Sequence, residues 1–421
     1  ANDYIDKYEL NSFKKIQLKT HLNNNNNKTF ANDYYLEEIR KEIISIFGED
    51  YLYNGGLSVR TSLNTEIQMI ADESLKKGLL DYDKRHGYRG PLENHTSNDW
   101  HLKYIKQKNP YNFLIAKIIS FDEENGKVNI EVILDNQMIY GVLTNYKWAR
   151  KSLSKGYVGP EINHASDILS VNDIIYVTKN ENNFNLEQIP KINGGIVVMD
   201  PFTGRVVALS GGFDFKLSNF NRAMQAKRQP GSSFKPFVYM SALENGLQPN
   251  SLILDAPFVV DQGEKLGKWK PENYGKKFYG PSTLRKGVEN SRNLMTVRIA
   301  QYLGMNKIAE IAERAGIMYD MPEVLSMALG AGETSLMNLT SGYSSFVNGG
   351  KKVKPSLIDR IQDRRGKNIY LKSQTKCDNC KMPYDGFNAK PNLIDLSERI
   401  FDEAKSYQMV SILKGAVDRG T

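Results

Sequence analysis

The stretch Arg228-Gln229-Pro230-Gly231-Ser232-Ser233-Phe234-Lys235-Pro236-Phe237 carries the clearest structural signal in the chain. Its Pro-Gly pair predicts a turn, and Ser232 stands where the N-cap of a helix would stand. The helix predicted to follow ends at Gly246. Because Ser232 and Lys235 are three residues apart, we expect both side chains on one face of the first helical turn.

This spacing suits nucleophilic catalysis. A serine hydroxyl is a weak nucleophile until a neighbouring base takes its proton, and a buried lysine can do this if its pKa falls far enough. The N-terminus of the helix also offers N–H groups and a partial positive charge to a developing oxyanion. Ser-x-x-Lys alone is common, however, and an isolated match is more often a capping serine beside a solvated lysine. The turn and the terminated helix favour the catalytic interpretation.

A second motif, Ser291-Arg292-Asn293, follows about 60 residues later. It lies between a helical stretch ending near Glu289 and another beginning at Leu294. On such a loop Ser291 can relay a proton, and Asn293 can hold a substrate amide. Taken alone, a serine and an asparagine here are more often helix caps. Paired with Ser232 and Lys235, they predict one shared site.

Outward from these motifs, two segment types define the fold. Residues 196–200 and 205–209 predict a hairpin that is apolar almost throughout, and therefore central in a sheet. Helical segments dominate residues 234–316. We expect an α+β fold with helices around a central antiparallel sheet. Five short strands in residues 113–189 predict a small antiparallel barrel of the oligonucleotide/oligosaccharide-binding (OB) type, here an interaction module.

The predicted organisation has four parts. Residues 1–34 are polar and read as a linker. Residues 35–109 form a region leading into the catalytic body, 110–190 form the inserted OB-like barrel, and 191–421 form the body that holds both motifs.

The bulk properties of the chain exclude several classes. With 421 residues it has room for two or three domains, and no run approaches the roughly 18 apolar residues that span a bilayer. A net charge of +8 fits a Lys- and Asn-rich composition better than nucleic-acid binding. The chain begins at Ala1 in polar sequence, so we expect it to be a piece of a longer protein.

Three weaker patterns keep ordinary explanations. Cys377 and Cys380 fit a short disulfide loop, half a zinc site or a redox pair; the disulfide loop is favoured, because no second pair completes a zinc site. Gly330 and Gly332 fit a tight turn at a helix start better than a phosphate loop. Scattered histidines indicate surface positions, and we expect no metal and no cofactor: His86, His95, His101 and His164.

Ser232-x-x-Lys235 with Ser291-x-Asn293 resembles the motif pair of the penicillin-recognising serine enzymes. The surrounding sequence resembles the transpeptidase domain of class A penicillin-binding proteins of the 1A type, and the likeness covers nearly everything after Tyr35. Four further stretches carry it: residues 85–91, 269–274, 279–281 and 329–333.

This resemblance implies a role for each motif residue. Ser232 would attack the carbonyl of the penultimate D-Ala of a peptidoglycan stem peptide, with Lys235 as general base. Ser291 would shuttle a proton to the leaving D-Ala, and Asn293 would bind the substrate backbone. An amine of a neighbouring stem would then close the cross-link, and a β-lactam antibiotic would leave a stable adduct on Ser232.

The resemblance also implies features that the chain does not carry. The family's Lys-Thr-Gly motif is absent up to Thr421, so we expect this exact chain to be incomplete or weakly active. A glycosyltransferase domain and a membrane anchor on the periplasmic side of the inner membrane would belong to the parent protein. Wall-synthesis proteins would bind the OB-like domain, and no nucleic acid is expected. The alternatives are a β-lactamase or β-lactam sensor, and a non-catalytic scaffold.

Overall fold

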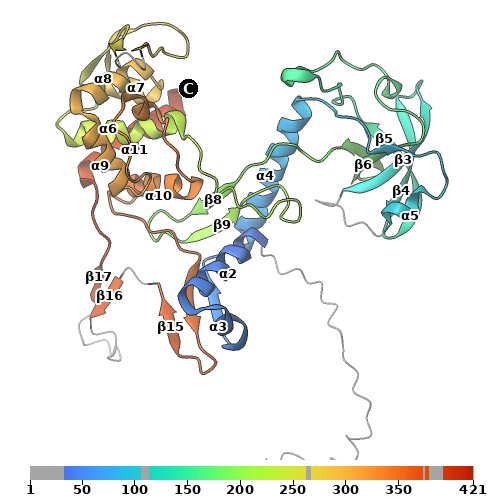
Figure 1. The fold of residues 1–421 in the computed structure, drawn as a ribbon, viewed down its shortest axis with the longest axis horizontal. Helices are drawn as coiled ribbons and strands as arrows, with labels where there is room; N and C mark the ends of the chain where they lie inside the picture. The colour runs from blue at the N-terminus through green and yellow to red at the C-terminus, as the bar shows by residue number, and fades with distance from the viewer. Residues whose placement is uncertain (1–32, 106–112, 262–266, 373–374, 379–391, 421) are drawn as a thin grey trace, which may run out of the picture.

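Two bodies and a long helix between them make up the fold (Figure 1). The computed structural model describes residues 33–105, 113–261, 267–372, 375–378 and 392–420. The smaller body is a barrel with its own apolar core, and the larger one holds both sequence motifs and two further core clusters. The connecting helix is α4 (Thr65–Arg85).

The smaller body is a closed barrel, as predicted. Strand β6 pairs with both β3 and β7, and β5 pairs with β7 in parallel, so the ring closes and leaves no free edge. Inward residues such as Ile130 and Ile175 are fully buried, which explains the alternating pattern of the sequence. The strands are β2 (Glu93–Asn94), β3 (Leu114–Asp122), β4 (Lys127–Leu134), β5 (Gln137–Asn145), β6 (Asp173–Asn180) and β7 (Asn183–Glu187).

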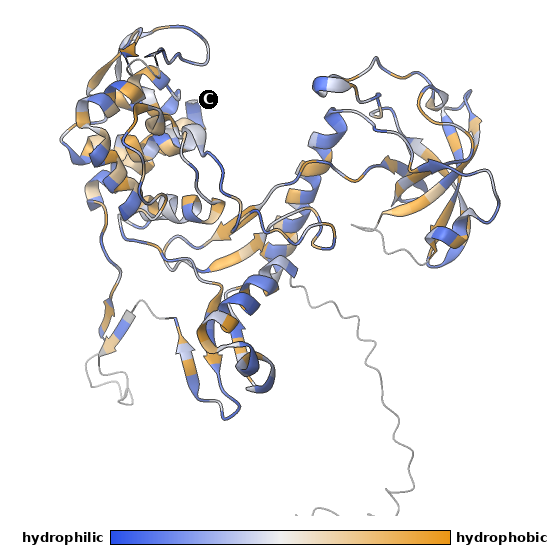
Figure 2. Ribbon diagram, viewed as in Figure 1, coloured by the Kyte–Doolittle hydropathy of each residue, from blue (hydrophilic) through white to orange (hydrophobic). Residues whose placement is uncertain are grey.

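The predicted hairpin is present as β8 (Ile196–Met199) and β9 (Val206–Ser210), but its expected place inside a larger sheet is wrong for the described residues. There it is a two-stranded sheet. Its residues are apolar because helices pack on both strands: α4 and α2 (Asp33–Phe47) pack on β9, and α10 (Leu336–Val347) packs on β8. Figure 2 shows the hairpin as an apolar segment between these helices. Packing of helices against the hairpin, rather than pairing at its edges, explains the apolar sequence pattern.

A buried helix, α6 (Lys235–Glu244), is the centre of the helical part. Every residue from Lys235 to Leu243 is buried, because other helices surround it. The predicted stop is confirmed: α6 ends with Asn245 at its C-cap, and Gly246 follows with φ +94°. The surrounding helices are α7 (Leu284–Glu289), α8 (Asn293–Leu303), α9 (Met305–Arg314) and α11 (Glu403–Arg419), with the 3-10 helices η4 (Gly231–Phe234) and η5 (Leu325–Leu329).

Helix α4 is held along its length. Asn64 caps its N-terminus by accepting two first-turn N–H groups at 3.1 Å. The buried Gln68 exchanges two hydrogen bonds with the backbone of Leu209 in β9. Near the other end, buried Asp83 binds Arg89 at 2.9 Å, together with groups that follow β7. The helix is therefore fixed to the larger body at one end and to the barrel region at the other (Figure 1).

The rest of the chain contains the predicted linker, the two cysteines and the shorter elements. The predicted linker falls outside the described residues except for Asp33 and Tyr34, which begin α2. Cys377 is disulfide-bonded, and Cys380 lies outside the described residues. The shorter elements are α3 (Glu49–Asn54), β1 (Ser58–Thr61), α5 (Trp100–Tyr104), η2 (Ser154–Gly156), η3 (Ala165–Asp167), β10 (Leu252–Asp255), β11 (Val260–Asp261), β12 (Lys268–Trp269), β13 (Gly280–Thr283), β14 (Ile358–Gln362), β15 (Asn368–Leu371), β16 (Thr375–Asp378) and β17 (Asn392–Asp395).

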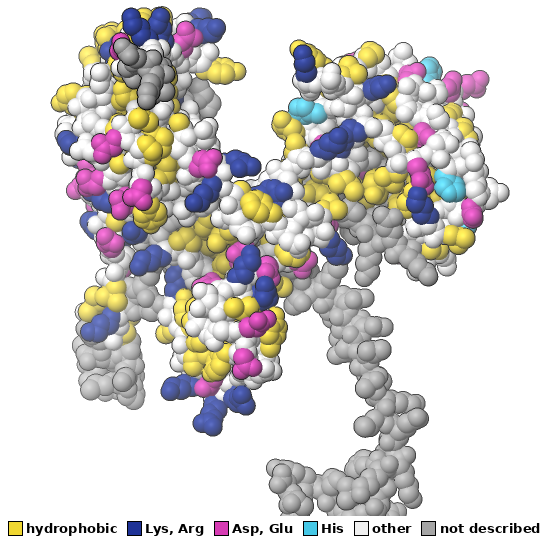
Figure 3. All heavy atoms as spheres, viewed as in Figure 1, with side chains coloured by type: hydrophobic (Ala, Val, Ile, Leu, Met, Phe, Trp, Pro, Cys, Tyr) yellow, Lys and Arg dark blue, Asp and Glu magenta, His cyan; other side chains and the backbone are white. Residues whose placement is uncertain are grey.

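The surface carries charges of both signs. On the face drawn in Figure 3, Lys and Arg side chains are interspersed with Asp and Glu. Among the residues that the structure describes, no helix combines the length and the apolar character that crossing a bilayer requires.

Candidate active site

Ser232 lies in the 3-10 helix η4, which leads into α6. The prediction that Ser232 caps the helix is wrong, because α6 begins at Lys235 and Ser232 makes no capping hydrogen bond. The Pro-Gly turn first winds the chain into a tighter helix, so the regular helix starts three residues later. In a 3-10 helix, side chains three residues apart eclipse one another. Ser232 and Lys235 therefore still share a face, with Ser232 exposed and Lys235 only 1% exposed.

The Lys235 amine joins the two sequence motifs. It hydrogen-bonds to the Ser291 carbonyl oxygen at 2.7 Å, the Asn293 Oδ1 atom at 2.6 Å and the Ser291 Oγ atom at 3.0 Å. The structure thus brings three of the four predicted residues into direct contact. The Ser232 hydroxyl, one turn before Lys235, makes no hydrogen bond within the described residues.

Burial changes the acid–base behaviour of this amine. Desolvation lowers the pKa of Lys235 from 10.5 to about 8. At pH 7, roughly a tenth of the lysine is then neutral. A neutral amine has two N–H groups, and these remain on the Ser291 carbonyl and Asn293 Oδ1, because both oxygens can only accept. Its lone pair then points away from these two oxygens, so the neutral amine can exchange a proton with a neighbouring serine hydroxyl.

The Ser-x-Asn loop has the backbone that this contact requires. Ser291 has φ +50°, a left-handed conformation that is uncommon outside glycine and that clusters at functional sites. With this turn, both its carbonyl and its hydroxyl reach Lys235. The capping alternative fails here, because Arg292 holds the N-cap position of α8 without a side-chain bond, while Ser291 and Asn293 bond to Lys235.

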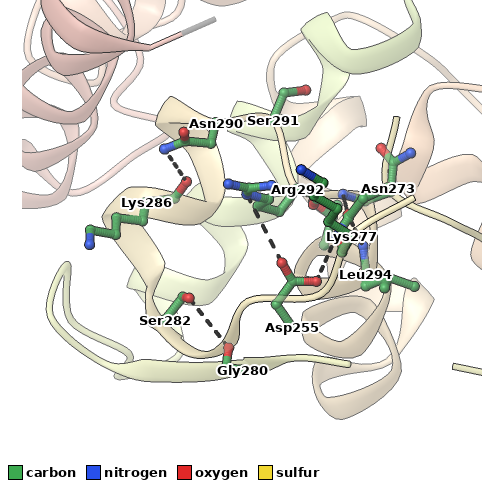
Figure 4. Close-up of polar contacts among 12 residues, drawn as sticks. Asp255, Asn273, Lys277, Gly280, Ser282, Lys286, Asn290, Ser291, Arg292 and Leu294 are labelled. Atoms are coloured by element: carbon green, nitrogen blue, oxygen red, sulfur yellow. Dashed lines mark hydrogen bonds and ion pairs between the residues drawn. The ribbon is translucent and has the colours of Figure 1, made fainter. Parts of the chain in front are cut away.

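Sequence reasoning missed two residues behind this loop, Asn273 and Asp255 (Figure 4). Asn273 Oδ1 accepts the backbone N–H of Asn293 at 2.9 Å, and its Nδ2 donates to Asp255 Oδ1 at 2.7 Å. Asn273 lies in one of the stretches that carried the family resemblance, which was a signal without a role attached. Asp255 had no sequence signal, because its importance comes from contacts about 20 and 40 residues further along the chain.

A glycine segment supports the turn that carries Ser232. Gly231 donates its N–H to the Gly330 carbonyl oxygen at 3.2 Å, and Arg228 and Thr334 exchange two backbone bonds of 3.0 Å. Gly330 ends η5 in the left-handed conformation, with φ +78°. The turn predicted there is present, but its predicted place at a helix start is wrong, since α10 begins only at Leu336. A Cβ atom at Gly330 would collide with the Gly231 carbonyl oxygen.

We expect Gly330→Ala to lower the rate of acylation by a fluorescent penicillin by roughly tenfold or more, since small displacements of reacting groups are costly. The left-handed backbone and the collision should also cost about 1–3 kcal/mol of stability, measured by thermal unfolding. Gly366→Ala is the matched control, because Gly366 has φ +79° with open space around it. Equal labelling rates for the two variants would contradict a role for Gly330 in supporting the turn.

In the described part of the chain, no cluster of three or more His, Cys, Asp or Glu side chains is placed to hold a metal ion. The histidines do not meet at the site: His86, His95 and His101 are half-buried near the barrel, and His164 is exposed.

With this geometry established, comparison with known proteins decides the family. Residues 194–420 match the penicillin-binding protein transpeptidase domain. The chain belongs to this family. Residues 88–192 match the penicillin-binding protein OB-like domain, and both matches confirm the fold and the family predicted from the motifs.

Named penicillin-binding proteins are similar over most of the chain. Penicillin-binding protein 1A of Rickettsia conorii is 39% identical over 400 residues, covering 94% of this chain and 49% of that protein. Penicillin-binding protein 1A of Pseudomonas aeruginosa is 38% identical over 344 residues, covering 80% of this chain and 41% of that protein. The crystal structure of penicillin-binding protein 1A from Haemophilus influenzae matches with a TM-score of 0.76 at 27% identity, over 99% of this chain and 62% of that one. The chain thus spans about half the length of the curated relatives it matches.

Proposed function

We propose that this chain supplies the DD-transpeptidase activity of a peptidoglycan synthase, forming wall cross-links by acyl-serine transfer from stem peptides ending in D-Ala-D-Ala. One observation carries the proposal. A buried lysine amine is held by Ser291 and Asn293, one helical turn after an exposed serine. Membership of the penicillin-binding transpeptidase family, and relatives named penicillin-binding protein 1A, support it.

In the acylation step, Ser232 Oγ attacks the carbonyl carbon of the penultimate D-Ala while neutral Lys235 takes the hydroxyl proton. Catalytic hydrogen bonds often tighten only when substrate binds, so the exposed Ser232 hydroxyl is compatible with this role. The peptide C–N bond then breaks. Ser291 Oγ passes the proton from the Lys235 ammonium to the departing D-Ala amine, and a Ser232 ester remains.

In the transfer step, the amine of a second stem peptide attacks the ester carbon. Lys235, neutral again, accepts the proton that this amine loses and returns it to Ser232 Oγ as the ester bond breaks. Asn293 Nδ2 donates one N–H to the Glu272 carbonyl at 2.7 Å, which leaves its second N–H for a substrate carbonyl. A β-lactam would enter the same acylation step and remain on Ser232.

The setting of the activity belongs to the same proposal. The parent protein would be anchored in the inner membrane with this region on the periplasmic side, and would also carry a glycosyltransferase domain. The OB-like barrel would bind wall-synthesis partners. Four parts, at residues 1–34, 35–109, 110–190 and 191–421, remain the predicted organisation.

The test is to locate the covalent adduct. The full-length protein that carries this chain should be labelled by a fluorescent penicillin, and peptide mass spectrometry should place the label on the peptide containing Ser232. A D-Ala-D-Ala stem peptide with an added amine acceptor should give a cross-linked product. An adduct on another residue would refute the assignment. An adduct that hydrolyses within seconds would indicate a β-lactamase, and absence of any adduct would indicate a scaffold.

A further inference from the structure

Behind the Ser-x-Asn loop, hydrogen bonds link a buried carboxylate to the lysine amine. Asp255, at the end of β10, is fully buried and accepts from Asn273 at 2.7 Å. Asn273 accepts from the backbone of Asn293 at 2.9 Å, and Asn293 Oδ1 accepts from Lys235 at 2.6 Å. Figure 4 shows Asp255, Asn273 and Arg292 converging below the loop that carries Ser291. Asn273 therefore lies one link from a proposed substrate-binding residue and two links from the proposed base.

Asn273 serves as the cap of α8, although it lies 20 residues earlier in the chain. Its Oδ1 accepts the N–H groups of the first two residues of the helix, Asn293 at 2.9 Å and Leu294 at 3.3 Å. Arg292, at the N-cap position, offers no side-chain acceptor. A helix start with unsatisfied N–H groups is unstable. The place where α8 begins is thus set by Asn273, and with it the backbone position of Asn293.

The orientation of the Asn273 amide is determined by its partners. Nδ2 donates to Asp255 Oδ1 and to the Lys277 carbonyl at 2.9 Å, which both only accept. Both partners of Oδ1 are N–H groups, which only donate. Exchanging the oxygen and the nitrogen would break all four bonds, so only one orientation fits. Asn273 is only 5% exposed, and water therefore competes little for these contacts.

Asp255 supports the loop by a second route. Among the described residues, its Oδ2 has no hydrogen-bond partner, and it forms an ion pair with Arg292, whose Nε lies at 4.0 Å. The Arg292 guanidinium lies over the Tyr279 ring, 3.4 Å from the ring centre. The carboxylate thus attracts the middle residue of the Ser-x-Asn motif directly and the last residue through Asn273. Because this carboxylate is buried, orients an amide and faces a cation, we expect it to fix the position of the loop, unlike a surface ion pair.

We propose that Asn273, oriented by Asp255, is a positioning residue for the Lys235 base. It sets the start of α8 so that Asn293 Oδ1 and the Ser291 oxygens meet the amine. The inference rests on the proposed transpeptidase function and adds two residues to its site. The oxygens that accept from the Lys235 amine belong to Ser291 and Asn293 and are neutral. The hydrogen bonds that run on from Asn293 through Asn273 end at a charged group, Asp255, which has Arg292 beside it.

The test uses three variants of the full-length protein, with acylation by a fluorescent penicillin followed from pH 6 to pH 10. Asn273→Ala should slow acylation roughly tenfold or more while circular dichroism shows a folded protein. Asn290→Ala is the matched control: it removes an amide from the same loop, but one that bonds only the Lys286 carbonyl of its own helix. Its rate should stay within about twofold of wild type.

The third variant exchanges the pair, Asp255→Asn with Asn273→Asp. The exchange keeps a hydrogen bond between the two positions with donor and acceptor reversed, and keeps an acceptor for the N–H groups of α8. It also moves the negative charge one link closer to Lys235, which favours the ammonium form. We therefore expect most of the rate to return at high pH, with the midpoint of the rate–pH curve raised by about half a unit or more.

Each result bears on a separate claim. Three results would overturn the positioning role: wild-type rates in Asn273→Ala, an exchanged pair that stays as slow as Asn273→Ala at high pH, or an exchanged pair with an unchanged midpoint. If Asn273→Ala fails to fold, the exchanged pair decides. If the wild-type protein is not labelled at Ser232, the proposed function fails, and this outcome is seen before any variant is compared.

Discussion

Ser232→Ala in the full-length protein should form no covalent adduct with a fluorescent penicillin and no cross-linked peptide. The variant removes the atom that becomes acylated, so the expected loss is at least about a thousandfold in rate, to the level of the assay background. Because Ser232 is exposed and its hydroxyl bonds to no described residue, the fold should be preserved. Thermal unfolding should show a change within about 0.5 kcal/mol.

Ser233→Ala is the matched control for this loss. Ser233 lies on the same 3-10 turn, but its hydroxyl donates to the Pro230 carbonyl at 2.6 Å instead of facing the site. It should be labelled within a few-fold of the wild-type rate, with the adduct still on Ser232. Labelling that survives Ser232→Ala at a comparable rate would show that another residue is the nucleophile, and the catalytic assignment would have to be abandoned.

The second large effect is expected at Lys235. Removing a general base typically costs about 100- to 10,000-fold in rate, and Lys235→Met should lose acylation on that scale. It would also leave the Ser291 carbonyl and Asn293 Oδ1 without a donor, at a cost of about 1–3 kcal/mol in stability. Lys235→Arg keeps the positive charge but cannot lose a proton at accessible pH, so it should be as slow as Lys235→Met.

The pH dependence has a definite sign. Burial lowers the pKa of Lys235 to about 8, and the neutral amine is the base, so the wild-type rate should rise with pH up to about 8 and level off above it. The Lys235→Arg rate should show no such rise. A wild-type rate independent of pH between 6 and 9, or normal acylation by Lys235→Arg, would contradict the role of this lysine as base.

Short motifs were enough to predict the family and the contact between three site residues, because the spacing within each motif determines its local geometry. Ser232 and Lys235 share a face in any helix with three to four residues per turn, so the prediction survived the replacement of an α-helical turn by η4. Ser291 and Asn293 had to lie close together where two helices meet, because both helices were readable from the sequence; Ser291 lies between them, and Asn293 is the first residue of α8. The catalytic roles of these residues stay predictions until the adduct is mapped.

Prediction from the sequence failed where contacts between residues far apart in the chain determine the structure. An apolar hairpin has the same pattern whether strands or helices cover it, and here helices do. Asp255 is a single acidic residue at the end of a short strand, and only the folded chain shows that it faces Asn273 and Arg292. Likewise, Gly330 looks like an ordinary turn glycine in the sequence. A side chain is excluded there because the Gly231 backbone, about 100 residues earlier in the chain, lies against it.

The anchoring of α4 has a mechanical consequence. Its 21 residues make a rod about 31 Å long, attached to β9 through Gln68 and to the barrel region through Asp83. A rod attached near both ends transmits displacement instead of absorbing it. We therefore expect a displacement of the barrel to be carried along α4 to β9, because Gln68 bonds to the Leu209 backbone there.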